Sequence, residues 1–232
     1  MPNNFNFAQV DVFTDDPLKG NPVAVVTVND DNLSNERMQN FANWTNLSET
    51  TFILPSNNAD YKLKIFTPKS ELPFAGHPTL GSASVYLDSL TQQQRSKIID
   101  NGGKLVQDCG IGLVELKWDY QSNVISFVAP PLIKFEKLES DIIVDVCESM
   151  NIDSQDVVDG YWVVNGPQWF ALRLKDASKV LNANILNKDK ILNYNFGIFG
   201  EYSSHHEGVK FEVRCFAPLL GVDEDPVTGS LK

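Results

Sequence analysis

Apolar and polar residues alternate along short segments in the first half of the chain, which predicts β-strands. Residues 61–66 place two lysines on one side and Leu63 and Ile65 on the other. Other short segments are rich in branched and aromatic residues and bounded by turn-forming residues, which also predicts strands. These are residues 10–13, 22–28, 50–54, and a hairpin of 113–118 with 124–128 around the turn 120–123.

Helical spacing of apolar residues appears between these strands. Residues 34–44 carry Met38, Phe41 and Ala42 on one face, Ser34 is a suitable N-cap, and Leu33 is placed to pack on Met38. A second helix is expected to open at a proline and run from residue 78 to about residue 87.

The second half of the chain shows the same mixture of elements. Residues 141–150 predict a helix, and residues 161–164, 169–174 and 209–216 predict strands. The segment 129–131, Ala-Pro-Pro, is the expected boundary between two domains, 1–129 and 130–232. The pattern predicts the α+β class, with strands outnumbering helices.

A motif occurs once in each half of the chain. Each copy begins with a strand that ends in Phe-x-Pro and continues, after a short loop, with a polar residue followed by Pro-x-x-Gly-Ser. The first copy covers residues 65–68 and 77–82, and the second covers residues 214–218 and 225–230. A repeat this long indicates two duplicated halves. Several elements follow Ser82, whereas two residues follow Ser230, so we expect the second half to be incomplete relative to the first.

Charge and cysteine usage restrict the classes of partner. The net charge of −11 argues against a nucleic-acid backbone or an anionic membrane as partner, because no basic excess is available to release counterions. The three cysteines show no metal-site or disulfide spacing. The N-terminus shows no signal-peptide pattern and no apolar run is long enough to span a bilayer. We therefore expect a cytoplasmic protein with reduced thiols and no metal.

The two repeated Pro-x-x-Gly-Ser segments are candidates for anion binding. If Pro78 and Pro226 each open a helix, unpaired backbone N–H groups and the positive end of the helix dipole gather there. Small residues after each proline would leave that backbone open to a ligand, and His77 and Asp225 would lie at its mouth. Alternatively both residues are only N-caps, which is a strong alternative for Asp225 taken alone because aspartate is a favoured cap, and a weaker one for His77. The duplication favours the functional interpretation for the pair.

Glu49 is a further candidate, at the junction between a predicted helix and a predicted strand. A partly buried carboxyl group there could have a pKa near neutrality, which suits proton transfer. The residues alone equally allow, and indeed favour, an ordinary surface glutamate. No dinucleotide-binding, P-loop or Gly-x-Ser-x-Gly motif is present.

At these residues the sequence resembles a known family, the PhzF-like isomerases of phenazine biosynthesis, which have the diaminopimelate-epimerase fold. Four ordered stretches carry the resemblance, which extends from about residue 5 to residue 230. They are residues 11–14 with 20–25, residues 46–52, residues 65–68 with 71–81, and residues 224–230.

The resemblance implies two pseudo-symmetric halves, each a β-sheet wrapped around a central helix, with the active site in the cleft between them. It implies that Glu49 moves a proton between carbon atoms of a small anionic metabolite, without cofactor or metal, and that His77 and Asp225 assist. A homodimer is also possible. The implied substrate-binding residues are Ser48, Gly76, Pro78, Thr79, Gly229 and Ser230. Racemisation by two cysteine bases is less expected, because no cysteine of this chain stands at those positions.

Other functions remain open from the sequence. The expected incompleteness of the second half favours a non-catalytic homologue, either a binding or scaffold protein or an inactive remnant. A hydrolase using Glu49 and Asp225 as a carboxylate pair has the right residue types but no support from the resemblance.

Overall fold

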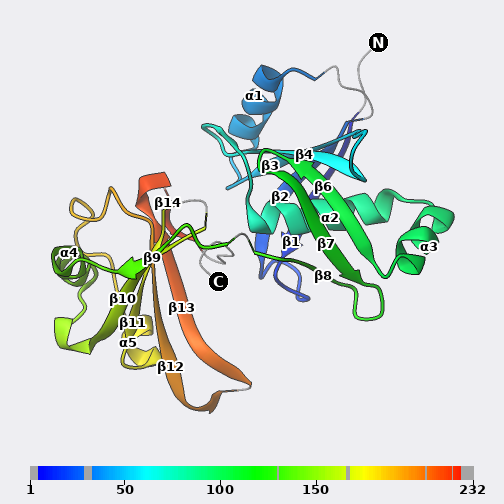
Figure 1. Cartoon of the computed structure of the whole chain (residues 1–232). Helices are drawn as coiled ribbons and strands as arrows, with labels where there is room; N and C mark the ends of the chain where they lie inside the picture. Colours follow the sequence, from blue (N-terminus) through cyan, green and yellow to red (C-terminus); the bar gives the residue numbers. More distant parts are fainter. Residues whose placement is uncertain are drawn as a thin grey trace. The chain divides into compact units, whose positions relative to one another are not determined.

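The computed structural model describes residues 5–28, 33–129, 131–165, 168–206, 208–220 and 222–225. The chain divides into two compact units, Met1–Val128 and Ala129–Lys232, and each is described by itself. Figure 1 shows the helices and strands of both units along the sequence.

A mixed sheet forms the first unit. The described residues build eight strands in the order β1-β2-β3-β4-β6-β7-β8, with β5 pairing on β4. Neighbours are antiparallel except β2 with β3 and β4 with β6, which are parallel. The strands are β1 (Asn6–Val12), β2 (Asn21–Thr27), β3 (Thr50–Leu54), β4 (Tyr61–Phe66), β5 (Glu71–Leu72), β6 (Lys104–Cys109), β7 (Gly112–Asp119) and β8 (Val124–Phe127).

Two helices cover this sheet on its two faces, because alternate residues of a strand point to opposite sides. The helices of the first unit are α1 (Asn35–Thr45), α2 (Gly76–Ser89) and α3 (Gln92–Asp100). The core under α2 includes Val23, Val25, Ile53, Ala83 and Leu87. The core under α1 includes Val26, Phe52, Phe66, Met38 and Ala42.

The second unit is a smaller sheet. The described residues build six strands in the order β14-β13-β12-β11-β10-β9, with α4 and α5 beside them (Figure 1). The elements are β9 (Lys134–Lys137), α4 (Ser140–Met150), η1 (Ser154–Asp156), β10 (Val157–Val164), β11 (Phe170–Leu174), α5 (Ala177–Asn182), β12 (Phe196–His206), β13 (Val209–Ala217), η2 (Pro218–Leu220) and β14 (Val222–Asp225). The aromatic rings of Phe170, Phe196 and Phe216 stack in its core.

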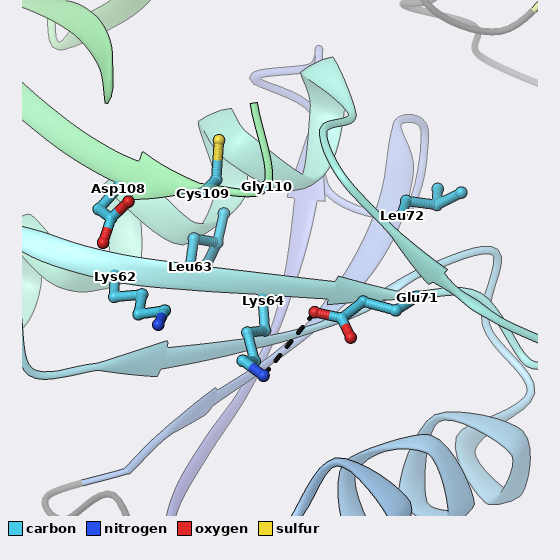
Figure 2. A pocket seen from close by; sticks show the side chains of 8 residues that line it. All are labelled: Lys62, Leu63, Lys64, Glu71, Leu72, Asp108, Cys109 and Gly110. Carbon is cyan, nitrogen blue, oxygen red and sulfur yellow. Dashed lines mark ion pairs between the residues drawn. The ribbon is translucent and has the colours of Figure 1, made fainter. Parts of the chain in front are cut away.

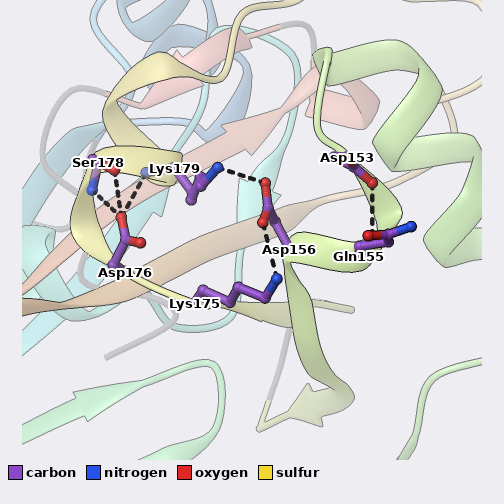
Figure 3. Close-up of polar contacts among 7 residues, drawn as sticks. All are labelled: Asp153, Gln155, Asp156, Lys175, Asp176, Ser178 and Lys179. Carbon is purple, nitrogen blue, oxygen red and sulfur yellow. Dashed lines mark hydrogen bonds and ion pairs between the residues drawn. The ribbon is translucent and has the colours of Figure 1, made fainter.

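Ion pairs and hydrogen bonds connect one end of this sheet to the short helices η1 and α5, as Figure 3 shows. Asp156 of η1 lies 3.3 Å from the Lys175 ammonium and 2.9 Å from that of Lys179. These lysines lower the pKa of Asp156, the hydrogen bond from Lys179 being the largest cause. Asp176 caps α5 by accepting hydrogen bonds from the backbone N–H groups of Ser178 and Lys179.

Most of the predicted elements are present. Ser34 caps α1, accepting a hydrogen bond of 3.3 Å from the Arg37 backbone N–H, and Leu33 packs on the cluster that contains Met38. The predicted hairpin is the antiparallel pair of β7 and β8. None of the three cysteines forms a disulfide, and all three are buried.

The structure corrects the start of one helix. We expected it to open at Pro78, but α2 begins at Gly76 with Ala75 as its N-cap. His77 therefore lies inside the first turn and is not a cap. The elements that were not predicted from the sequence are α3, α5, β5, β6, β9, β12 and β14. The helix predicted from Pro226 lies outside the described residues.

Candidate active site

Glu49 and His77 lie side by side in the first unit. Glu49 Oε2 is 3.4 Å from His77 Nδ1, and the two side chains are 18% and 8% exposed. His77 Nε2 is buried and makes no hydrogen bond within the part of the chain that the structure describes. The structure thus brings together two of the three predicted catalytic residues, as a carboxyl group and an imidazole at the edge of the core.

The register of the sheet brings these two residues together. Glu49 comes two residues before Thr51, so in an extended segment both side chains point to the same face. Thr51 is buried, and its hydroxyl accepts a hydrogen bond of 2.8 Å from Ser82 of α2. Thr51 in turn donates to the Ala24 carbonyl at 3.2 Å. This chain of hydrogen bonds fixes the end of β3 against α2, whose first turn carries His77.

Burial changes the protonation of His77. Its pKa is lowered to about 4, because burial disfavours the charged imidazolium. A hydrogen-bonding interaction with the Pro22 backbone raises the pKa, but by less than burial lowers it. His77 is therefore neutral at neutral pH. Its contact with Glu49 joins a neutral imidazole to a carboxyl group, a pair suited to holding or passing a proton.

This lowered pKa predicts a loss of stability in mild acid. The unfolded chain takes up a proton on His77 near pH 6.5, whereas the folded protein resists it down to about pH 4. The contribution of the neutral His77 to the free energy of unfolding is therefore complete above about pH 6.5. It is lost as the pH falls toward 4, by about 3 kcal/mol in total. Urea unfolding at pH 7.5 and pH 4.5 measures it. His77→Gln should show a smaller loss between these pH values than the wild type, and an equal loss would contradict the assignment.

The first turn of α2 holds the other predicted binding residues of this unit. Gly76 is partly exposed, whereas Pro78 and Thr79 are buried. The Thr79 hydroxyl accepts a hydrogen bond of 3.2 Å from Gln107, whose carbonyl oxygen accepts one of 3.1 Å from Tyr61. The Thr79 side chain therefore anchors the helix to the sheet, and its backbone N–H is also paired, donating to the Ala75 carbonyl at 3.2 Å.

Small residues in α2 serve packing, which corrects a second expectation. We expected Gly81 and Ser82 to leave the backbone open to a ligand. A Cβ on Gly81 would instead lie 2.5 Å from Val23 Cγ1 and 3.0 Å from Val12 Cγ2, and Ser82 is fully buried. Glycine is present because α2 crosses the sheet at close range.

Gly81→Ala is therefore expected to destabilise the first unit by about 1–3 kcal/mol, because the added methyl group forces α2 away from β2. Chemical denaturation measures this loss. Gly102→Ala gives a comparison in which the added Cβ would meet nothing within 4 Å, but its φ of +70° adds backbone strain of about 1–2 kcal/mol. A Gly81→Ala variant as stable as the wild type would contradict the close approach of α2 to the sheet.

The remaining predicted residues are placed as follows. Ser48 is exposed in the bend before Glu49. Asp225 is the last residue of β14 in the second unit and pairs with Cys215 of β13. Gly229 and Ser230 lie outside the described residues.

Phe13 lies beside His77 of the Glu49–His77 pair, and no role was predicted for it from the sequence. Its ring centroid is 6.4 Å from that of His77, and its side chain is 43% exposed. Its φ of 67° is uncommon for a residue other than glycine, and such conformations gather at functional sites. Two signals in the sequence marked this position: Phe13 belongs to the stretch 11–14 that carries the family resemblance, and a dense turn follows it.

A cavity of about 280 Å³ lies elsewhere in the first unit, on β4 between β5 and β6 (Figure 2). The cavity forms at Leu63 and Lys64 of β4, because neither β5 nor β6 pairs with β4 at these two residues. Neither Glu49 nor His77 lines it. Its lysines and carboxylates are balanced in number, so it favours no one sign of ligand charge: Lys62, Lys64, Glu71 and Asp108.

The residues that the structure describes contain no cluster of three or more histidine, cysteine, aspartate or glutamate side chains that could hold a metal ion. None of their helices combines the length and the apolar character needed to cross a membrane.

Known proteins with similar sequences cover nearly the whole chain. The family model described as PhzC-PhzF, phenazine biosynthesis-like protein, matches residues 10–232. Antisense-enhancing sequence 1 of Schizosaccharomyces pombe is 37% identical over 97% of this chain and 77% of its own length. Trans-2,3-dihydro-3-hydroxyanthranilate isomerase of Pseudomonas fluorescens is 33% identical over 97% of this chain and 76% of its own length.

Solved structures support the same assignment. A phenazine biosynthesis PhzC/PhzF protein of Clostridium difficile is 27% identical, with a TM-score of 0.74 over 98% of this chain and 78% of that one. A PhzF-family protein of Bacillus anthracis has a TM-score of 0.76 at 22% identity, covering 97% of this chain and 76% of that one. The predicted fold class is therefore confirmed: two mixed sheets with helices, in the PhzF-like arrangement.

Proposed function

Because the chain belongs to the PhzC-PhzF family of phenazine biosynthesis-like proteins, we propose that it is an isomerase that shifts a proton on a small anionic metabolite. Glu49 is the general acid and base. Its carboxylate takes a proton from one carbon atom and returns it to another, so that substrate and product have the same composition. Such a reaction needs no redox partner and no group carrier.

The observation that carries this proposal is the contact of Glu49 with a neutral His77. The imidazole Nδ1 is 3.4 Å from the carboxylate, and burial keeps the imidazole uncharged. A neutral imidazole does not hold Glu49 in a strong ion pair, so the carboxylate stays able to exchange its proton. With Nδ1 toward Glu49, the buried Nε2 can make a hydrogen bond to the substrate.

The substrate anion is proposed to bind at the start of α2. The first N–H groups of a helix have no partner within it and attract negative charge. Gly76 offers its backbone there without a side chain, Pro78 fixes the first turn, Thr79 holds the turn to the sheet, and Ser48 lies beside Glu49. Asp225 is proposed as a further substrate-contacting residue because it repeats His77 in the second half of the sequence. Gly229 and Ser230 repeat Gly81 and Ser82, which pack inside the first unit, so their proposed contact with the substrate rests on the resemblance to the family alone.

The test uses the compound that the named relative isomerises, trans-2,3-dihydro-3-hydroxyanthranilate, as the first probe. The purified chain is incubated with it in D₂O, and NMR follows both the isomer formed and the deuterium incorporated at carbon. Isomer formation supports the proposal. If this compound is inert, a panel of unsaturated cyclic amino and hydroxy acids follows, and a panel in which no compound is isomerised or gains deuterium would refute the proposal.

A second candidate function is binding without catalysis. One relative at 37% identity, the fission yeast protein, has a name that describes no enzyme. This function predicts that small anionic metabolites bind, as measured by calorimetry, while none of them exchanges a proton with the solvent.

A further inference from the structure

We propose that Arg214 and Glu224 are positioning residues that fix Asp225 for the reaction. This inference rests on the proposed function, because it assigns to Asp225 a part in the chemistry. Neither residue needs to touch the substrate for this role. Both act through the short strand β14, which ends at Asp225.

Arg214 holds Glu224 in a two-point contact. Its Nε donates to Glu224 Oε1 at 2.7 Å and its Nη2 to Oε2 at 2.8 Å, which is the paired geometry that a guanidinium and a carboxylate favour. The Arg214 side chain is 21% exposed and that of Glu224 39% exposed. The hydrogen bond with Glu224 raises the pKa of Arg214, so the guanidinium stays protonated at every ordinary pH.

The guanidinium is itself held on its other side. Arg214 Nη1 donates to the carbonyl oxygens of Val180 at 3.1 Å and Ala183 at 2.6 Å, where α5 ends. A cation is favoured at the C-terminal end of a helix. The guanidinium also lies over the ring of Phe216, 5.2 Å from its centroid. Arg214 therefore ties β14 to a helix and to the aromatic core of the unit.

Strand alternation transmits this contact to Asp225. Adjacent residues of a strand point to opposite faces, so Glu224 turns toward Arg214 and Asp225 turns to the other face. Asp225 pairs with Cys215 in the register of β13 and β14. Cys215 belongs to a buried cluster with Trp169 and Ala217, on the face opposite to Arg214. Fixing Glu224 on one face thus sets the position and direction of Asp225 on the other.

The first unit contains a looser version of the same arrangement. Lys64 stands two residues before Phe66, as Arg214 stands two residues before Phe216. Its ammonium lies 3.8 Å from Glu71 Oε1, on the short strand β5 that leads to α2 (Figure 2). A lysine makes a point contact, whereas an arginine can hold both oxygens of a carboxylate. In each unit a basic residue before the Phe-x-Pro segment contacts a carboxylate on a short strand, which precedes His77 in the first unit and ends at Asp225 in the second.

The experiment is a double-mutant cycle in the turnover assay described above. Glu224→Gln keeps the shape of the side chain and removes its charge, and Arg214→Lys keeps the charge and removes the paired geometry. We expect each to lower kcat about tenfold while KM changes less than about twofold, because a misplaced reacting group costs rate rather than binding. Arg214→Gln should lose more than Arg214→Lys. Glu224→Gln combined with Asp225→Asn should be no slower than Asp225→Asn alone.

The matched control is Asp223→Asn. Asp223 lies on the same strand and pairs with Lys188, but its side chain is exposed, so kcat should stay unchanged. Two results would overturn the role of Arg214 and Glu224 while leaving the proposed function intact. One is a loss of kcat in the Glu224→Gln, Asp225→Asn double variant that equals the combined losses of the two single variants. The other is a loss of kcat for Asp223→Asn as large as that for Glu224→Gln. A wild-type chain that is inactive on every compound of the panel would overturn the proposed function, and this inference with it.

Discussion

Glu49→Gln should lower turnover by about 10²–10⁴-fold while leaving the fold unchanged, because general acid–base catalysis contributes this much to a rate. The amide fills the same space as the carboxyl group and can still reach His77, whose Nδ1 is 3.4 Å from Glu49 Oε2. It cannot take up and return a proton. The rates of isomer formation and of deuterium incorporation measure the loss, and circular dichroism checks the fold.

Two further variants separate chemistry from charge. Glu115→Gln removes a carboxylate from the same unit, where Glu115 is exposed on β7 and pairs with Lys104, and should leave turnover unchanged. Glu49→Asp keeps the carboxyl group but withdraws it by one methylene, so its turnover should fall between those of the wild type and Glu49→Gln. A Glu49→Gln variant as active as the wild type would remove the glutamate mechanism.

The location of Glu49 shows what the sequence could predict about the site. The pattern placed it between a helix and a strand, and the structure confirms this position between α1 and β3. The sequence could not predict its neighbour, because Glu49 and His77 are far apart along the chain. The parallel pairing of β2 with β3, together with the Ser82–Thr51 hydrogen bond, brings them together. Only the resemblance to a family pointed to both residues at once.

The local sequence pattern also led to wrong predictions for residues whose role depends on packing. Gly81 appeared suited to ligand approach, since a missing side chain exposes the backbone equally to a ligand and to a neighbouring strand. The contact of Gly81 with Val23 shows that the glycine serves packing, and this contact depends on the tertiary structure, which the local sequence does not specify. Likewise α3 was missed, because its sequence is mostly polar and only Ile98 is buried. Its start could have been found from the capping box of Thr91 and Gln94.

The second unit should depend on a single aromatic side chain. Phe196 is fully buried, with its ring stacked between those of Phe170 at 5.4 Å and Phe216 at 5.2 Å. Phe196→Ala should cost about 3–5 kcal/mol, because it removes a large apolar group and leaves a cavity in a core that stiff strands cannot close. Total stability is about 5–15 kcal/mol for an ordinary domain, so this change approaches the limit of folding. Urea unfolding measures it, and Phe196→Leu gives a milder variant if the alanine form does not fold.

Phe135→Ala isolates the contribution of burial from that of ring stacking. Phe135 stacks on Tyr161 at 5.1 Å in the same sheet, but its side chain is 62% exposed. An exposed stacked pair contributes about 0.5–1.5 kcal/mol, so this variant should lose far less than Phe196→Ala. Equal losses would mean that Phe196 is not at the centre of the core. A large difference would show that α4, α5 and the sheet close a core of their own around Phe196, on which β13 and the Arg214–Glu224 contact are built.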